Sequence, residues 1–383
     1  MTLKLDKSAW KRVAFGDVVR NANETIRNLD AAGIGRIIAM EHLDPGELKI
    51  SRWGSTEDGT TFTRRVRPGQ TLFGKRRAYQ RKVAFAEFDA ICSGDIYTFE
   101  ADETQILGEF LPFLVQSNEF FDHALGTSAG SLSPRTNWRD LASFEFELPP
   151  FDEQMRIADL LWSIERHRLQ LVNVAAKLRE AATMLIEDLR GSRRAVKYVR
   201  DVATVRNGQN YPKSMQDGRA GDVPFFKVAD LDRPGNERYL TNPGGWVTAD
   251  DVAALSADVL PAGTVVTARV GAAIHLERRR ALAAPALVDE NHLIIRPHAI
   301  DPAYLLAVLA ETQLARSSNG GVVPSLNQQI VGGVAFPDLP HGAERRVGAA
   351  YRTIGDFRDG VLHEVTSLTG LRTAVLIDVF GGN

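Results

Sequence analysis

Two long stretches of this chain repeat apolar residues at alternating steps of three and four positions, and this pattern restricts the possible folds most. The first stretch runs from Asp152 to Arg190 and the second from Glu344 to Phe380. Residues spaced in this way lie along one side of an α-helix, as in coiled coils. Each helix would be on the order of 55 Å long at 1.5 Å per residue, too long to be buried in one small domain. We therefore expect the two helices to pack against each other as an antiparallel pair.

Each apolar series is interrupted by an arginine at its fourth step, Arg168 in the first and Arg358 in the second. A charge in a coiled-coil seam lowers stability and often specifies register. The alternative is that the aliphatic stem packs while the guanidinium reaches solvent, which is the more common behaviour of a long cationic side chain.

The segments before the two helices also follow one plan. In the first, residues 70–73 and 95–99 read as strands and residues 107–125 as a helix; in the second, residues 260–266 and 291–296 read as strands and 302–315 as a helix. We expect an α+β protein with homologous domains at residues 1–150 and 192–340, a central helix at 151–191 and a C-terminal helix at 341–383.

A basic run is the strongest candidate binding feature. The net charge of the chain is −2, yet the segment from Thr63 to Ala84 holds eight basic residues and no acidic one. Such residues neutralise DNA phosphates, and arginine can bond guanine through two hydrogen bonds. A solvated charged hairpin is the alternative. The candidates, with one aromatic ring suited to stacking, are Arg64, Arg65, Arg67, Lys75, Arg76, Arg77, Tyr79, Arg81 and Lys82.

Weaker DNA-binding candidates lie elsewhere. In the second half of the chain, the segment that corresponds to the basic run also contains the acidic Glu277, which lowers its net positive charge. An earlier loop offers amide side chains suited to the edges of adenine. A third set lies just before the two long helices. An ordinary charged hairpin and an ordinary turn are equally good interpretations of the first two. These candidates are Arg269, His275, Arg278, Arg279 and Arg280; Asn207, Gln209, Asn210, Tyr211 and Lys213; and Ser131, Arg135, Asn137, Ser325, Asn327 and Gln328.

No enzyme motif is complete. Leu148-Pro149-Pro150-Phe151 has the prolines of an adenine-methyltransferase loop but an apolar residue where the amide or carboxylate must be, and the glycine-rich stretch at Gly33 lacks its third glycine. Residues 289–292 (Asp-Glu-Asn-His) are better interpreted as a surface acidic turn than as a metal site. The single cysteine and the lack of a membrane-length apolar stretch predict a cytoplasmic protein without structural zinc.

Four segments together resemble the specificity subunits of type I restriction-modification enzymes, over essentially the whole chain. They are Gly69-Gln70-Thr71-Leu72-Phe73, Cys92-Ser93-Gly94-Asp95-Ile96, residues 130–138 (Gly-Ser-Leu-Ser-Pro-Arg-Thr-Asn-Trp) and residues 148–154 (Leu-Pro-Pro-Phe-Asp-Glu-Gln). The second half departs from this pattern, with Asp289-Glu290-Asn291 in place of Ser-Gly-Asp.

The resemblance implies a non-catalytic subunit that reads a bipartite, asymmetric double-stranded DNA target, one half-site per domain, with the paired helices as spacer. It implies as partners two copies of an adenine-N6 methyltransferase subunit and the restriction subunits. S-adenosylmethionine, ATP and magnesium would then belong to those partners, and this chain would have no cofactor of its own. The alternatives are a specificity-like subunit of another DNA-modifying defence system, a helical scaffold that binds protein partners, and an enzyme with an unrecognised site.

Overall fold

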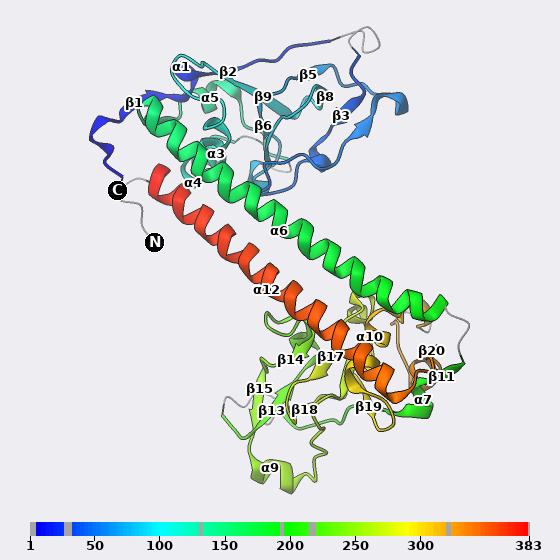
Figure 1. Ribbon diagram of the computed structural model, residues 1–383. Helices are drawn as coiled ribbons and strands as arrows, with labels where there is room; N and C mark the ends of the chain where they lie inside the picture. The colour runs from blue at the N-terminus through cyan, green and yellow to red at the C-terminus, as the bar shows by residue number, and fades with distance from the viewer. Residues whose placement is uncertain are drawn as a thin grey trace. The chain divides into compact units, whose positions relative to one another are not determined.

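The computed structural model describes residues 5–26, 33–128, 130, 133–191, 195–213, 220–318 and 323–381. The chain divides into unit 1, which is Met1–Leu171 with Glu364–Asn383, and unit 2, which is Val172–His363. Each unit contains an α+β domain and part of each long helix, α6 (Phe151–Gly191) and α12 (His341–Phe380) (Figure 1). Unit 1 is therefore built from both ends of the sequence.

The domain of unit 1 contains two four-stranded sheets and a two-stranded pair (Figure 1). The strand orders are β2-β9-β6-β7 and β4-β3-β8-β5, and β1 pairs with β10. Within the second sheet, β3 and β8 run parallel. The bounds are β1 (Lys11–Ala14), β2 (Val19–Asn21), β3 (Arg36–Ile38), β4 (Gly54–Ser55), β5 (Arg64–Val66), β6 (Thr71–Gly74), β7 (Val83–Phe85), β8 (Ala90–Cys92), β9 (Ile96–Ala101), β10 (Glu145–Leu148), α1 (Phe15–Val18), α3 (Leu111–Gln116), α4 (Asn118–Gly126) and α5 (Trp138–Ala142).

The domain of unit 2 contains a five-stranded sheet, a three-stranded sheet and a two-stranded pair. Their orders are β12-β19-β16-β17-β14, β15-β13-β18 and β11-β20, and β13 and β18 run parallel. The bounds are β11 (Val196–Tyr198), β12 (Ala203–Asn207), β13 (Val223–Phe226), β14 (Tyr239–Leu240), β15 (Gly245–Val247), β16 (Val265–Ala268), β17 (Arg279–Leu282), β18 (Leu287–Val288), β19 (His292–Pro297), β20 (Ala335–Pro337), α7 (Val199–Val202), α9 (Ala249–Ala254), α10 (Pro302–Ala310) and α11 (Gln328–Gly332).

The two domains have the same strand connectivity over most of their sheets. The order β2-β9-β6-β7 corresponds to β12-β19-β16-β17, and β4-β3-β8 corresponds to β15-β13-β18. The parallel pair β3–β8 has its counterpart in β13–β18. The domains differ at the sheet edges: unit 1 adds β5 beside β8, and unit 2 adds β14 parallel to β17.

The expected helix at residues 107–125 is two helices, α3 and α4, separated at Ser117. The backbone of Ser117 is extended, with φ −63° and ψ 156°, and its hydroxyl accepts a hydrogen bond from the Phe120 amide at 3.2 Å. A serine in this conformation caps a new helix better than it continues an old one, because its side chain replaces a missing intrahelical partner. The expectation of one helix was therefore wrong.

Within unit 1, α6 and α12 lie side by side in opposite directions (Figure 1). Glu165 of α6 contacts Arg372 of α12 at 2.9 Å, and His167, farther along α6, contacts Glu364, which is earlier in α12, at 3.1 Å. The apolar residues Ile157 and Leu161 pack with Val375 and Val379 in one cluster with the aromatic core of the domain.

The seam arginine of α6 does not reach solvent. Arg168 is only 6% exposed, and its guanidinium bonds Glu165 at 2.8 Å and also Glu47 of the domain. These two carboxylates raise the pKa of Arg168. The expectation that the guanidinium reaches solvent is wrong for Arg168, because carboxylates are available inside the unit. Arg358 is partly exposed and lies 3.5 Å from Asp359.

None of the helices in the described ranges is both long enough and apolar enough to span a membrane.

Candidate nucleic-acid interface

The basic run of unit 1 is divided between two places. Arg64 and Arg65 lie on the edge strand β5, with Arg67 just beyond its end. The other candidates lie in the connection between β6 and β7, residues 75–82, which we call the β6–β7 loop and which contains the 3₁₀ helix η4 (Ala78–Gln80). The run is therefore not one continuous cationic ribbon.

Acidic residues from other parts of the sequence neutralise the β5 cluster. Arg67 bonds Glu24 at 2.7 Å, and Arg65 bonds Asp89 at 2.8 Å as well as Glu24 at 3.5 Å. Arg67 lowers the pKa of Glu24, mainly through this hydrogen bond. Arg64 donates to the backbone carbonyls of Ile96 and Gly94. The run has no acidic neighbour in sequence, but it has several in space.

Three side chains of the β6–β7 loop are engaged inside the domain. Lys75 lies 4.8 Å from the centre of the Tyr97 ring, and burial lowers its pKa. Lys82 donates to the carbonyl of Met40 at 2.6 Å. Arg81 donates to Asn118 at 2.9 Å and to the carbonyl of Gln116 at 3.1 Å. These contacts hold the loop on the domain and leave these cations less available to a ligand.

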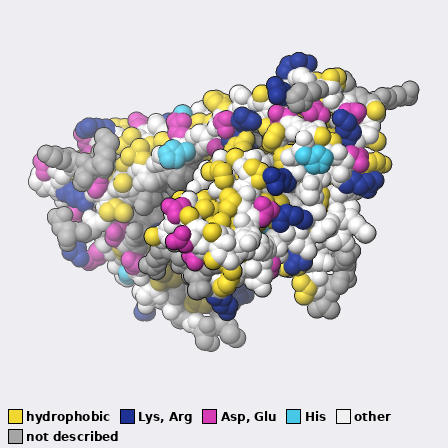
Figure 2. Space-filling view, turned by 90° about the horizontal axis from the view of Figure 1, so that it is seen from below, with side chains coloured by type: hydrophobic (Ala, Val, Ile, Leu, Met, Phe, Trp, Pro, Cys, Tyr) yellow, Lys and Arg dark blue, Asp and Glu magenta, His cyan; other side chains and the backbone are white. Residues whose placement is uncertain are grey.

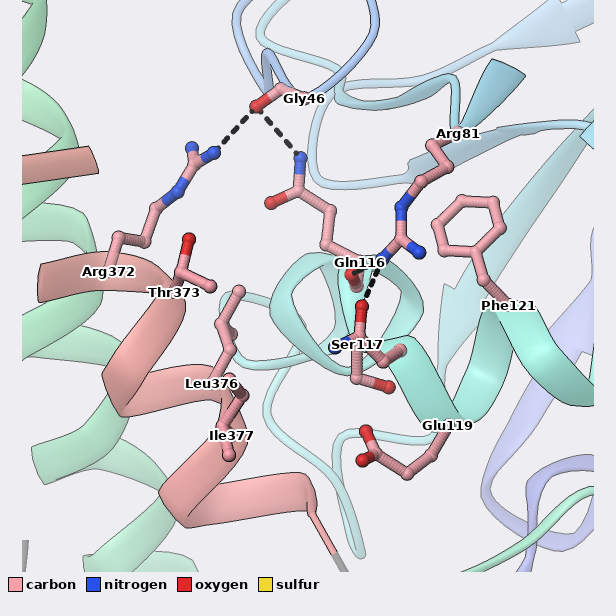
Figure 3. A pocket seen from close by; sticks show the side chains of 11 residues that line it. Gly46, Arg81, Gln116, Ser117, Glu119, Phe121, Arg372, Thr373, Leu376 and Ile377 are labelled. Atoms are coloured by element: carbon pink, nitrogen blue, oxygen red, sulfur yellow. Dashed lines mark hydrogen bonds between the residues drawn. The ribbon is translucent and has the colours of Figure 1, made fainter. Parts of the chain in front are cut away.

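Arg81 also lines a cavity of about 210 Å³ between the domain and α12 (Figure 3). The carbonyl oxygen of Gly46 accepts hydrogen bonds there from Arg372 at 3.0 Å and from Gln116 at 3.3 Å. Leu376 and its neighbour on α12 form the apolar side of the cavity. Arg81 therefore belongs to the attachment of the domain to α12.

The remaining cations of the β6–β7 loop stay accessible. The Arg76 side chain is 41% exposed and bonds the hydroxyl of Ser133 at 3.3 Å, and Arg77 bonds the same hydroxyl at 3.4 Å. Tyr79 is 56% exposed. Arg77 and Arg81, on either side of η4, have positive φ angles of 55° and 51°. Left-handed backbone at non-glycine residues is strained and is concentrated at functional sites.

Arg135 joins this accessible group from a distant part of the sequence. A β-bridge pairs Arg76 with Arg135, and the Arg77 amide donates to the Pro134 carbonyl at 2.8 Å. Asp95 contacts both arginines, Arg135 at 3.0 Å and Arg76 at 3.6 Å, and it raises the pKa of Arg135. Two guanidinium groups on one carboxylate leave a net positive charge at the surface. Ser131 lies outside the described residues.

The loop after β12 in unit 2 is only partly exposed. Asn207, Asn210 and Lys213 are exposed. Tyr211 is 4% exposed, packs edge-on against Phe225 at 5.5 Å and donates to Gln209 at 3.2 Å. Burial raises its pKa. Tyr211 is a core residue, so the structure does not offer its ring for stacking.

The arginines that follow β16 are mostly paired. Arg269 donates to the carbonyl of Glu290 at 3.0 Å, and Arg278 bonds Asp232 at 2.5 Å. The Arg279 side chain is 1% exposed and pairs with Glu277. Arg280 lines a cavity of about 340 Å³ inside unit 2, where burial lowers its pKa to about 10. Arg279 and Arg280 therefore face the interior of unit 2, whereas His275 is exposed.

Asn327 and the pair Asp289–His292 have structural roles. The side chain of Asn327 accepts a hydrogen bond from the Ile330 amide at 2.8 Å and caps α11. Asp289 and His292 are 6% and 0% exposed and bond each other at 2.7 Å, so they are a buried pair and not a surface turn. Within the described ranges no group of three or more potential metal ligands exists.

The sequence interpretation missed Asp95 and Ser133, which hold the accessible arginines in place. Both residues are part of the segments quoted for the resemblance. Only the pairing of residues 76 and 135 brings them together, and no local spacing in the sequence predicts that bridge.

Acidic and basic side chains are interspersed on the face that Figure 2 shows. This agrees with the ion pairs described above and with the net charge of −2. A general affinity for polyanions is not expected from such a surface, so any recognition of DNA depends on local groups such as Arg76, Arg77 and Arg135.

No protein-family model matches the sequence. The type I restriction enzyme EcoDI specificity subunit of Escherichia coli is 29% identical over 150 residues, which are 39% of this chain and 33% of that subunit. The crystal structure of the type I restriction-modification S subunit from M. genitalium matches 100% of both chains with a TM-score of 0.66 and 16% identity. The chain has the fold of a type I specificity subunit. A chain from a structure of type I restriction-modification complex assembly also matches, over 98% of both chains, with a TM-score of 0.54 and 17% identity.

The specificity-subunit fold accounts for both the mixed domains and the long helices. The sequence match to the EcoDI subunit spans about a third of that relative's length. In this specificity-subunit fold the accessible arginines belong to unit 1, and the equivalent loop of unit 2 carries different side chains.

Proposed function

We propose that this chain is the sequence-specific DNA-binding specificity subunit of a type I restriction-modification complex. The observation that carries the proposal is the fold match over the entire length of the M. genitalium S subunit, helices included. The sequence identity with the EcoDI specificity subunit supports the same assignment over 150 residues. The accessible cluster of Arg76, Arg77 and Arg135 gives unit 1 a surface suited to DNA.

The proposed target is bipartite and asymmetric, with one half-site read by each domain. The matching strand orders of the two domains support a duplicated reader. The unlike side chains on their equivalent loops support two different half-sites, because different donors and acceptors read different base pairs. In this proposal the long helices α6 and α12 are the spacer between the two readers.

The proposed partners are double-stranded DNA, two copies of an adenine-N6 methyltransferase subunit and the restriction subunits. The chain itself is a non-catalytic targeting subunit. S-adenosylmethionine, ATP and magnesium would bind to the partners. This division of labour rests on the proposed assignment.

The proposal is tested by mapping methylated adenines genome-wide in a strain with and without this chain. We expect one split motif to lose methylation completely when the chain is removed. An unchanged methylation map, together with no co-purifying methyltransferase, would overturn the proposal.

Salt-dependent binding to duplex DNA separates a DNA reader from a protein-binding scaffold. Each phosphate contact contributes about 0.9 to the slope of log affinity against log salt. Replacing Arg76 and Arg77 by glutamine should weaken binding and flatten this slope. The control is Arg12→Gln. Arg12 lies on β1 with its side chain 75% exposed, and the salt slope of DNA binding by this variant should stay at the wild-type value. A slope that is unchanged in the double variant would assign Arg76 and Arg77 to the solvated surface.

A further inference from the structure

The two domains present the same backbone loop at equivalent places. In unit 1 the β6–β7 loop pairs Arg76 with Arg135; in unit 2 the connection from β16 to β17 pairs Val270 with Ser325. The backbone hydrogen bonds correspond as well. The Lys75 amide donates to the Asp95 carbonyl at 3.0 Å in unit 1, and in unit 2 the Arg269 amide donates to the Asn291 carbonyl at 2.8 Å. In the same way, the Arg77 amide donates to the Pro134 carbonyl at 2.8 Å, and the Gly271 amide donates to the Pro324 carbonyl at 2.9 Å.

A short 3₁₀ helix follows in both loops, η4 in unit 1 and η6 (Ala272–Leu276) in unit 2. Each ends in a residue with a left-handed backbone, Arg81 in the first and Glu277 in the second, both with φ of 51°. The two loops therefore begin and end alike, although η6 is longer than η4, and they carry two different sets of side chains.

The charged set of unit 1 is replaced as a group in unit 2. Arg76, Arg135 and the carboxylate that holds them, Asp95, correspond to Val270, Ser325 and Asn291. Since unit 2 forms the same loop without these charges, the charges are not required for the backbone conformation. They are thus free to serve recognition, and Asp95 acts as a positioning residue for the two arginines.

The replacement changes which bases each loop can read. An arginine held at the surface offers two parallel donors, which match the O6 and N7 acceptors of guanine in the major groove. Unit 2 offers apolar surface at the same place, including Val270 and the 61% exposed Val323, the counterpart of Ser133. Apolar side chains contact the methyl group of thymine.

We infer that unit 1 reads a half-site containing guanine through Arg76 and Arg135, and that unit 2 reads a half-site in which thymine methyl groups take their place. This inference rests on the proposed function.

The test is selection of duplexes from a randomised DNA library by the full chain assembled with its methyltransferase partner. Wild type should enrich a split motif with guanine fixed in one half. The exchange variant Arg76→Val with Asp95→Asn and Arg135→Ser should lower the guanine preference in that half by roughly 5- to 150-fold per arginine–guanine pair. The other half of the motif is the internal control and should be unchanged.

A second variant keeps the positive charge at residue 135 and removes only the planar arrangement of hydrogen-bond donors. Arg135→Lys still neutralises a phosphate but lacks the rigid planar fork with which a guanidinium presents two parallel donors. We expect its salt slope to match wild type while guanine discrimination falls. Because Arg135 is 52% exposed, this substitution leaves the core intact.

The outcomes separate the two levels of the proposal. If wild type enriches no motif and methylates no DNA, the proposed function fails and the inference fails with it. If wild type selects a split motif but both variants retain full guanine preference, the inference alone is overturned. If the exchange variant changes the base preference in the half of the motif without the fixed guanine, the assignment of half-sites to units is wrong.

Discussion

At the scale of single residues, the charge of a side chain says little about its role until its partners are known. Arg67 and Arg76 belong to one basic run in the sequence. Arg67 is held by Glu24, whereas Arg76 shares Asp95 with Arg135 and lies in an accessible loop. Because exposed ion pairs contribute little to stability, we expect Asp95 to affect the positions of Arg76 and Arg135 more than the stability of the fold.

Replacing Asp95 by asparagine should therefore change recognition more than stability. The loop gains one unit of positive charge and loses the group that orients Arg76 and Arg135. We expect affinity for unrelated duplexes to increase and the ratio of target to non-target affinity to fall, as measured by competition binding at fixed salt. Asp89→Asn is the matched control, because it removes a carboxylate from Arg65 on β5 with the same change in charge. Equal losses of specificity in the two variants would contradict the role of Asp95.

Cys92 should be protected from thiol reagents in the folded protein. It is the only cysteine, it is fully buried in β8, and burial raises its pKa from 9.0 to about 12. Because the thiolate is the reactive form, labelling at pH 8 should be at least about 100-fold slower in native protein than in urea. Rapid labelling of the native chain would contradict the packing of β8.

The same shift predicts how stability depends on pH. Below about pH 9 the Cys92 thiol is protonated in both states. Between about pH 9 and pH 12 only the unfolded state ionises it, so the unfolded state binds fewer protons and the free energy of unfolding decreases as pH rises. Cys92→Ala should lack this component, which urea unfolding at several pH values would measure.

At the scale of elements, a buried ion cluster joins α6, α12 and the domain of unit 1. Glu165 is 1% exposed and bonds both Arg168 and Arg372, while Arg168 also reaches Glu47. Buried charges of this kind stabilise only when every member is paired, since an uncompensated buried charge is strongly unfavourable.

Glu165→Gln should destabilise unit 1 by roughly 3–5 kcal/mol, because it leaves two buried guanidinium groups without their shared carboxylate. The shift would be measured as a lower urea midpoint with an unchanged slope. Glu364→Gln is the control on the same helix pair: it pairs with His167 at the surface, where both side chains are about half exposed, and a change well below 1 kcal/mol is expected. Similar midpoints for both variants would mean that the buried cluster adds no stability.

At the scale of the whole molecule, the two units are not consecutive pieces of sequence. Residues 364–383 belong to unit 1 although unit 2 precedes them. Val375 and Val379 are buried in the core of unit 1, and the Phe380 ring lies 5.4 Å from Phe110. The end of α12 is thus part of the folding unit at the beginning of the chain.

Ending the chain at His363 should therefore open unit 1 and not merely shorten a helix. Burial of Val375, Val379 and Arg372 would be lost together with the partner of Glu165. We expect Cys92 labelling to accelerate markedly, although Cys92 lies more than 270 residues before the deletion. A chain that ends at Gly381 is the control and should label as slowly as wild type. Slow labelling in both would show that unit 1 is stable without residues 364–380 of α12.

The spacing of apolar residues was enough to predict the two long helices, because positions three and four residues apart lie on one side of a helix. The twofold plan of the segments before them is likewise a prediction from the sequence. The candidate set also held Arg76, Arg77 and Arg135, which lie together around the bridge between residues 76 and 135.

Which of the candidate side chains can meet a ligand depends on the folded domains. The bridge between residues 76 and 135, the pairing of Arg67 with Glu24 and the burial of Tyr211 and Arg279 all join residues that are distant in sequence or depend on packing around them. Helical periodicity is a local property that repeats along the chain, whereas charge neutralisation and burial depend on neighbours in space, and those neighbours exist only once the sheets have formed.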